Sequence, residues 1–195
     1  GIFGIFRYTP PSNSHIMAPM LGDWDAPKTE STVPQLDPSS SIKSILYVDA
    51  YDSFSYNVVA MLEETLGVKV TVMTIDSEWP DSNMNEFLQH YEAVVLGPGP
   101  GDPNVPTDVG IMRDIWNLHD SELLPVFGIC LGFQSLCLHH GIPIERLPYP
   151  IHGQIHKIST SAKDIFEHLP EVEVTLYHSL YANSASSTST DLEYL

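Results

Sequence analysis

Residues 44–141 alternate between two patterns of apolar and polar positions. Short apolar runs rich in β-branched residues recur, and each has the length of a strand buried inside a parallel sheet. Longer segments with apolar residues at helical spacing lie between these runs. The predicted strands are ILYVD (45–49), VKVTVMTI (68–75), AVVLG (93–97) and LPVFGI (124–129). The predicted helices span 53–67, 83–91, 107–119 and 132–140.

This alternation predicts the fold class. Strands joined by helices at this spacing form right-handed βαβ units, whose strands lie parallel in one sheet. We therefore expect an α/β fold with a doubly wound, mostly parallel sheet and helices on both faces. After Gly141, three short strand candidates follow at 142–147, 153–159 and 172–178, and these predict a small antiparallel extension.

The first helix carries its own start and stop signals. Ser53 is a candidate N-cap, because its hydroxyl can accept a hydrogen bond from the first turn. Gly67 is a candidate C-terminal stop, since glycine readily takes the left-handed conformation that ends helices. The apolar residues expected on one face of this helix are Val58, Met61, Leu62 and Leu66.

The two ends of the chain lack these patterns. Residues 1–41 are rich in Pro, Ser and Thr with no persistent period, so we expect a disordered leader. The pattern fades again over 184–195, which we expect to be an irregular tail. These boundaries leave a single predicted domain at 42–183.

Composition narrows the classes of partner. The 195 residues are 43% hydrophobic, and 8 Lys and Arg stand against 25 Asp and Glu for a net charge of -17. This excess of acidic residues argues against binding to nucleic acid or to an anionic membrane. No apolar run is long enough to span a membrane. The two cysteines, Cys130 and Cys137, fall in one turn-plus-helix unit, so we expect no disulfide and a cytoplasmic location.

The segment VFGICLGFQ places Cys130 between a predicted strand and a predicted helix. Gly128 and Gly132 flank the cysteine where a sharp strand-to-helix elbow needs backbone room, as in the serine elbow of hydrolases. At the helix N-terminus, the dipole is expected to lower the thiol pKa and favour the thiolate. The amide of Leu131 would point to the place where an oxyanion forms.

The segment LGPGPGDP, residues 96–103, follows another predicted strand. Its glycines allow the backbone to approach a ligand, and its prolines stiffen the loop. Such a loop can present amide hydrogens to a tetrahedral intermediate. The segment lacks the Lys-Ser/Thr ending of a phosphate-binding loop.

Each of these signals has an ordinary structural explanation when it is taken alone. A cysteine in apolar surroundings packs as a small hydrophobic residue, and a Gly/Pro-rich segment is usually a turn. The two together, each at the carboxyl end of a parallel strand, indicate a catalytic site. Cys137 has no flanking glycines and lies within the helix, so we expect it in the core.

Five motifs resemble, in order, those of the class I (triad-type) glutamine amidotransferases, in particular the subgroup that serves chorismate-using synthases. The motifs are DAYDSFSYN, LGPGPGDP, VFGICLGFQSL, HGQIHKI and YHSLYA. The resemblance covers residues 44 to 183 and implies a flavodoxin-like strand order. It also implies hydrolysis of glutamine, in which a thiolate attacks the side-chain amide, ammonia leaves, and water cleaves the glutamyl thioester.

The resemblance assigns roles to particular residues. It implies that Cys130 is the nucleophile and that the amides of Leu131 and Gly99 form the oxyanion hole. Gly99, Pro100 and Gly101 would bind glutamine together with Gln134. Ser179 and Leu180 would bind the amino-acid end of the substrate.

The family's His-Pro-Glu motif, which supplies the base and the residue that orients it, does not occur in this sequence after YHSL. We therefore expect the chain to be truncated before its triad His and Glu, and to hydrolyse glutamine poorly by itself. The nearby histidines His152, His156 and His178 are alternative bases, although we expect them in loops or at the surface. His139 and His140 end a helix, where positive charge is favoured, and need no catalytic role.

The motif details are most similar to the fused aminodeoxychorismate synthases of fungi and plants, in the p-aminobenzoate branch of folate biosynthesis. The resemblance then implies a chorismate-binding synthase partner, fused C-terminally in the full-length protein. No metal-ligand spacing is evident, so no cofactor is expected in this domain. The resemblance implies Mg²⁺ only in the partner synthase domain. The alternatives are the amidotransferase component of anthranilate synthase, and a non-catalytic module that only binds a synthase.

Overall fold

The computed structural model describes residues 43–80, 83–118, 124–160 and 170–183. Four parallel strands form the central sheet in the order β2-β1-β3-β4. Their bounds are β1 Ser44–Asp49, β2 Lys69–Thr74, β3 Ala93–Leu96 and β4 Val126–Gly128. The helices are α1 Ser55–Leu66, α2 Met84–Leu88, α3 Pro106–Val109, α4 Met112–Trp116 and α5 Leu131–His139. The predicted α/β fold with a parallel sheet is confirmed.

Strand β1 occupies an inner position, because it pairs in parallel with β2 on one side and β3 on the other. Its residues Leu46, Tyr47 and Val48 are fully buried. A strand with neighbours on both edges and helices on both faces has no solvent-facing side, which is why its sequence is continuously apolar.

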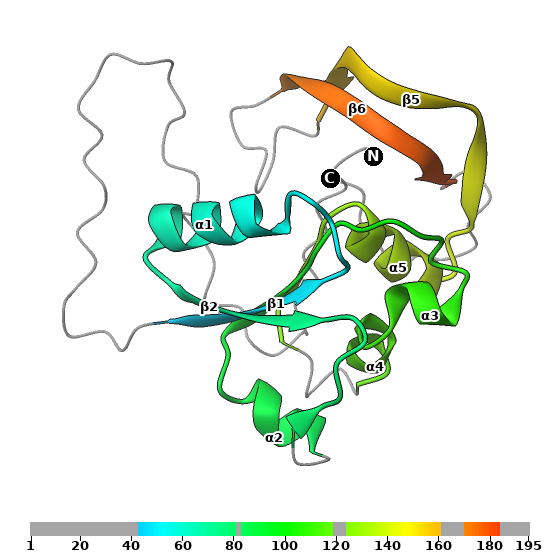
Figure 1. Cartoon of the computed structure of the whole chain (residues 1–195). Helices are drawn as coiled ribbons and strands as arrows, with labels where there is room; N and C mark the ends of the chain where they lie inside the picture. The colour runs from blue at the N-terminus through cyan, green and yellow to red at the C-terminus, as the bar shows by residue number, and fades with distance from the viewer. Residues whose placement is uncertain (1–42, 81–82, 119–123, 161–169, 184–195) are drawn as a thin grey trace, which may run out of the picture.

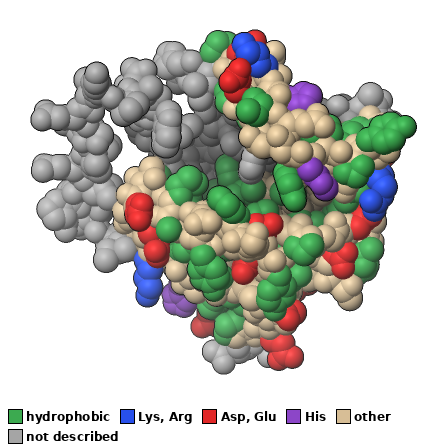
Figure 2. All heavy atoms as spheres, turned by 45° about the horizontal axis from the view of Figure 1, so that its top comes forward, with side chains coloured by type: hydrophobic (Ala, Val, Ile, Leu, Met, Phe, Trp, Pro, Cys, Tyr) green, Lys and Arg blue, Asp and Glu red, His purple; other side chains and the backbone are tan. Residues whose placement is uncertain are grey.

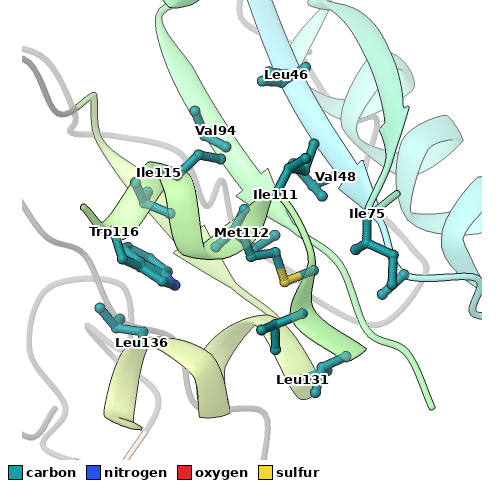
Figure 3. Packing of buried hydrophobic residues seen from close by; sticks show 14 of the residues in the cluster. Leu46, Val48, Ile75, Val94, Ile111, Met112, Ile115, Trp116, Leu131 and Leu136 are labelled. Atoms are coloured by element: carbon teal, nitrogen blue, oxygen red, sulfur yellow. The ribbon is translucent and has the colours of Figure 1, made fainter. Parts of the chain in front are cut away.

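Two hydrophobic layers cover the sheet. Side chains alternate across a strand, so Ile45 and Tyr47 face the layer of α1 while Leu46 and Val48 face the other layer. Figure 1 shows α1 on one side of the strands and α2 and α4 on the other. The second layer contains Met112, Ile115 and Trp116 of α4 together with Leu131 and Leu136 of α5 (Figure 3).

Helix α1 differs from the prediction at its start and on its face. Its N-cap is Phe54, not Ser53, because the side chain of Asp52 forms the preceding turn by accepting from the amide of Phe54 at 2.7 Å. Met61 is exposed, since Ser55 and Val59 lie on the buried side of the helix. Gly67 ends the helix in the left-handed conformation, as predicted.

The helix predicted at 107–119 is two short helices, α3 and α4, within its described part. The break lies at Gly110, which has a φ of 47°. A side chain at this position would collide with the backbone carbonyl of Ile75, and the amide of Ile111 donates to that same carbonyl at 2.9 Å. The chain therefore leaves the helical path to dock on the end of β2.

The extension beyond α5 is a two-stranded antiparallel ribbon of β5 Ile144–Ser159 and β6 Glu171–Ala182. The strand candidates at 142–147 and 153–159 are parts of one strand, not two, because β5 continues through a register shift between Arg146 and Ile151. The predicted leader and tail at 1–41 and 184–195 lie outside the described residues. Within the residues described, no helix is long and apolar enough to cross a membrane.

Candidate active site

Cys130 lies in a sharp turn between β4 and α5. It forms the N-cap of α5 with φ 52° and ψ −106°, a backbone conformation that residues other than glycine rarely adopt. The flanking glycines allow this turn. A Cβ on Gly128 would lie 2.7 Å from the backbone nitrogen of Phe133, and one on Gly132 would overlap the carbonyl of Leu96.

Backbone hydrogen bonds fasten the elbow to the end of β3. The amide of Ile129 donates to the carbonyl of Leu96 at 2.9 Å, and the amide of Gly132 reaches the carbonyl of Gly97 at 3.3 Å. Helix α5 then begins with the amide of Gln134 donating to the carbonyl of Cys130 at 2.8 Å. The elbow and the loop at 96–103 are thus held against each other.

The loop at 96–103 is itself anchored at both ends. At its start, the amide of Gly97 donates to the carbonyl of Val48 at 2.9 Å. Gly99 lies so close to Ala50 that any side chain would collide with it. Further along, the amide of Asp102 donates to Oδ2 of Asp108 at 2.9 Å. The backbone of this loop is therefore fixed next to the elbow, where its amides can reach a group bound there.

The Cys130 thiol is partly buried, and two predicted partners converge on it. Burial raises the pKa of the Cys130 thiol above its ordinary value. Hydrogen bonding from the backbone amides of Leu131 and Gly99 counteracts part of that rise, while the Asp52 carboxylate adds to it. The prediction of a lowered thiol pKa is therefore wrong, because desolvation of the thiolate outweighs the hydrogen bonds from the backbone amides.

Gln134 and the YHSL segment meet although they are far apart in the sequence. The carboxamide of Gln134 is buried, and its Nε2 donates to the carbonyl of Leu180 on β6 at 3.4 Å. Ser179 is half-buried beside Leu180. Pro100 and Gly101 are exposed in the loop after β3. The substrate-binding residues predicted from the sequence are thus contributed by β6, α5 and the loop that follows β3.

The histidines differ from one another. His152 and His156 are exposed, as expected, and so is His139 near the end of α5. His178 is buried on β6, so the expectation of a loop or surface position is wrong for it. Its Nδ1 lies 2.8 Å from the carbonyl of Leu180, and burial lowers the pKa of its imidazole.

Asp49, at the end of β1, is a supporting residue that sequence reasoning missed. Its buried carboxylate accepts from the hydroxyl of Ser55 at 2.5 Å and from the amide of Tyr51 at 2.9 Å. These bonds hold the segment that carries Asp52 beside the thiol. An acidic residue at the carboxyl end of a buried strand was the available signal.

Cys137 is fully buried in α5, which confirms its expected place in the core. Both cysteines are free thiols. In the part of the chain that is described, no group of three or more His, Cys, Asp or Glu side chains is arranged to hold a metal ion.

Comparison with known proteins adds a family to this geometry. Residues 46–195 match the protein family described as "Glutamine amidotransferase class-I". The chain is 35% identical over 155 residues to the aminodeoxychorismate synthase of Saccharomyces cerevisiae, covering 72% of this chain and 20% of that protein. It is 36% identical over 140 residues to anthranilate synthase component II of Haloarcula marismortui, covering 71% of this chain and 64% of that protein.

A glutamine amidotransferase of Thermotoga maritima has the same fold, with a TM-score of 0.57 at 17% identity, covering 74% of this chain and 64% of that chain. The chain spans only 20% of the length of the yeast synthase.

Proposed function

The chain belongs to the class I glutamine amidotransferase family, and from this premise we propose that it binds glutamine and hydrolyses its side-chain amide at Cys130. The observation that carries the proposal is the convergence of the Gly99 and Leu131 amides on the Cys130 thiol, at an elbow between strand and helix. Two amides directed at one nucleophile are the donors that a developing oxyanion needs.

The proposed reaction proceeds through a thioester. The Cys130 thiolate forms a C–S bond to the side-chain carbonyl carbon, and the carbonyl oxygen becomes an oxyanion held by the two amides. The C–N bond then breaks, and the nitrogen takes up a proton and leaves as ammonia. Water adds to the thioester and displaces the thiol, which gives glutamate.

In this proposal, the remaining predicted residues bind the substrate. Gly99, Pro100 and Gly101 border the reacting amide, and Gln134, Ser179 and Leu180 hold the amino-acid end. No metal takes part in these steps within this domain.

Deprotonation of the thiol requires a base, because burial keeps the thiol neutral near pH 7. No described histidine is among the groups that shift the pKa of the Cys130 thiol. Nδ1 of His178 is already bonded to the Leu180 carbonyl. We therefore propose that efficient turnover depends on a histidine–glutamate pair supplied from outside the described residues.

The test is glutamate release from glutamine together with mass spectrometry of the Cys130 thioester. The 195-residue chain should release glutamate slowly, and Cys130→Ala should abolish both release and thioester. Cys137→Ala is the matched control, because it removes the other thiol and should leave both signals. Equal glutamate release by Cys130→Ala and the parent chain would refute the proposal, and fast turnover would show that a base lies within the chain.

We further propose that the ammonia serves a chorismate-using synthase of the aminodeoxychorismate type, in the p-aminobenzoate branch of folate biosynthesis, fused C-terminally in the cytoplasm. The motif details of VFGICLGFQSL and HGQIHKI and the similarity to the yeast synthase support this branch. Exposed aromatic side chains of Tyr51, Phe54 and Tyr56, on the segment that carries Asp52, suit a partner surface.

The anthranilate branch is a second candidate, because the similarity to component II of Haloarcula marismortui is of the same order. The product separates the two: the full-length protein, given chorismate and glutamine, should form aminodeoxychorismate, whereas the second candidate predicts anthranilate. Synthesis that proceeds with ammonia and gains nothing from glutamine would instead indicate a non-catalytic module.

A further inference from the structure

Two side chains from different elements meet at one backbone carbonyl. The carbonyl oxygen of Leu180 lies 3.4 Å from Nε2 of Gln134 and 2.8 Å from Nδ1 of His178. A carbonyl oxygen only accepts hydrogen bonds and has two lone pairs, so both facing nitrogens must carry hydrogen. The chemistry of this junction therefore fixes the orientation of the Gln134 carboxamide and the tautomer of His178.

The two bonds differ in length. The His178 bond of 2.8 Å is at the short end of the usual range for N–H···O bonds, whereas the Gln134 bond of 3.4 Å is longer than usual. The imidazole thus makes the stronger of the two hydrogen bonds to the Leu180 carbonyl. It keeps that carbonyl in place for the weaker bond from Gln134.

The other ring nitrogen supports the same assignment. Nε2 of His178 is buried and has no hydrogen-bond partner among the described residues, and the residue is only 8% exposed. A proton there would create a buried cation without an acceptor. His178 is therefore held neutral, with its hydrogen on Nδ1.

The orientation of the Gln134 nitrogen also determines where the oxygen of its carboxamide lies. With Nε2 donating to Leu180, the remaining polar atom is Oε1, which is an acceptor. An amino acid presents an ammonium group, which is rich in donors. Gln134 lies one helical turn after Cys130, within reach of a substrate whose side-chain amide is at the thiol.

We propose that His178 is a positioning residue for glutamine binding: its Nδ1–H holds the Leu180 carbonyl, which holds Nε2 of Gln134 and presents Oε1 to the ammonium group of bound glutamine. This inference rests on the proposed function. It assigns His178 no contact with the reacting atoms and no role as the base.

The experiment measures glutamine binding to the 195-residue chain without requiring turnover. Iodoacetamide alkylates Cys130, and mass spectrometry locates the label. The extent to which added glutamine slows this alkylation gives the dissociation constant of glutamine. The side-chain amide nitrogen of an asparagine at position 178 lies near the place that Nδ1 of His178 occupies. The side-chain amide nitrogen of a glutamine at the same position lies near the place of Nε2. His178→Ala and His178→Gln should raise the dissociation constant for glutamine about 5- to 10-fold, the loss of roughly one hydrogen bond. His178→Asn should stay within about twofold of the parent chain by keeping that bond.

The alkylation rate without glutamine should be the same in all four proteins, which separates loss of positioning from collapse of the site. If the parent chain shows no protection by glutamine, the proposed function fails and this inference with it. If the parent chain is protected and His178→Ala and His178→Gln bind glutamine equally well, this inference alone is overturned.

A measurement on the chain without substitutions tests the inference even if the His178 variants do not fold. The imidazole ¹⁵N shifts of His178 should show the proton on Nδ1, and they should move when glutamine is added. A proton on Nε2, or ¹⁵N shifts that do not change at saturating glutamine, would overturn the inference.

Discussion

At the scale of single residues, the Cys130 thiol shows how two opposing effects combine. Hydrogen bonds from the amides of Leu131 and Gly99 favour the thiolate, while burial disfavours it more strongly. The elbow therefore orients a thiol that remains protonated at neutral pH. Its glycines and its position are evident in the sequence, but the sign of the pKa shift depends on how much of the sulfur the folded chain covers.

The raised pKa predicts the pH dependence of alkylation at Cys130. Only the thiolate reacts, so the rate should climb about tenfold per pH unit below the pKa and level off above it. The midpoint should lie at a higher pH than for the same cysteine in the urea-unfolded chain. Iodoacetamide kinetics from pH 6 to pH 11, with the label located by mass spectrometry, measure both midpoints. A lower midpoint in the folded chain would mean that the helix N-terminus dominates.

At the scale of elements, the close approach of α5 to β3 decides where the thiol lies. Gly132 makes this approach possible, because its Cα faces the Leu96 carbonyl and its amide bonds to the carbonyls of Gly97 and Ile129. Exposed aromatic side chains, among them Tyr56 of α1 and Tyr149 and Tyr177 of the ribbon, lie outside this packing. Figure 2 shows hydrophobic and acidic side chains next to each other on the surface. The order of the elements follows from hydrophobic periodicity, whereas the break at Gly110 and the continuity of β5 follow from contacts with distant segments.

We expect Gly132→Ala to push α5 away from β3. The added methyl group meets backbone rather than a flexible side chain, so the free energy of unfolding should fall by about 1–3 kcal/mol. Urea unfolding followed by circular dichroism measures this loss. Gly141→Asn is the matched control at the other end of α5, where nothing lies within 4 Å and asparagine tolerates the φ of 75°. Equal stability of the two variants would show that the contact with Leu96 is not limiting.

At the scale of the whole molecule, folding buries groups that can ionise. Cys137 is fully buried, and desolvation raises its pKa to about 12. An acid whose folded pKa is raised contributes stability below its unfolded pKa, and that contribution is lost as pH rises above it. The relevant window therefore opens near the ordinary thiol pKa of about 8.5 and extends upward.

The stability of the chain should fall between pH 7 and pH 10 partly because Cys137 ionises only when unfolded. With an unfolded pKa of about 8.5, this thiol should account for roughly 2 kcal/mol of the loss at pH 10. Urea unfolding at both pH values, compared between the parent chain and Cys137→Ala, isolates that share because the other ionisable groups cancel. An identical fall in the variant would mean that Cys137 ionises in the folded chain.

The sequence by itself determined the parallel α/β order, the elbow around Cys130 and the family motifs, because periodicity, glycine spacing and short motifs are local properties. Only the tertiary structure decided that the thiol pKa is raised, that His178 is buried, and that Gln134 and His178 share the Leu180 carbonyl. Each of these depends on which distant segments exclude water from a side chain or bring a carbonyl to it. Desolvation and partner geometry are set by packing between elements, which no window of neighbouring residues contains.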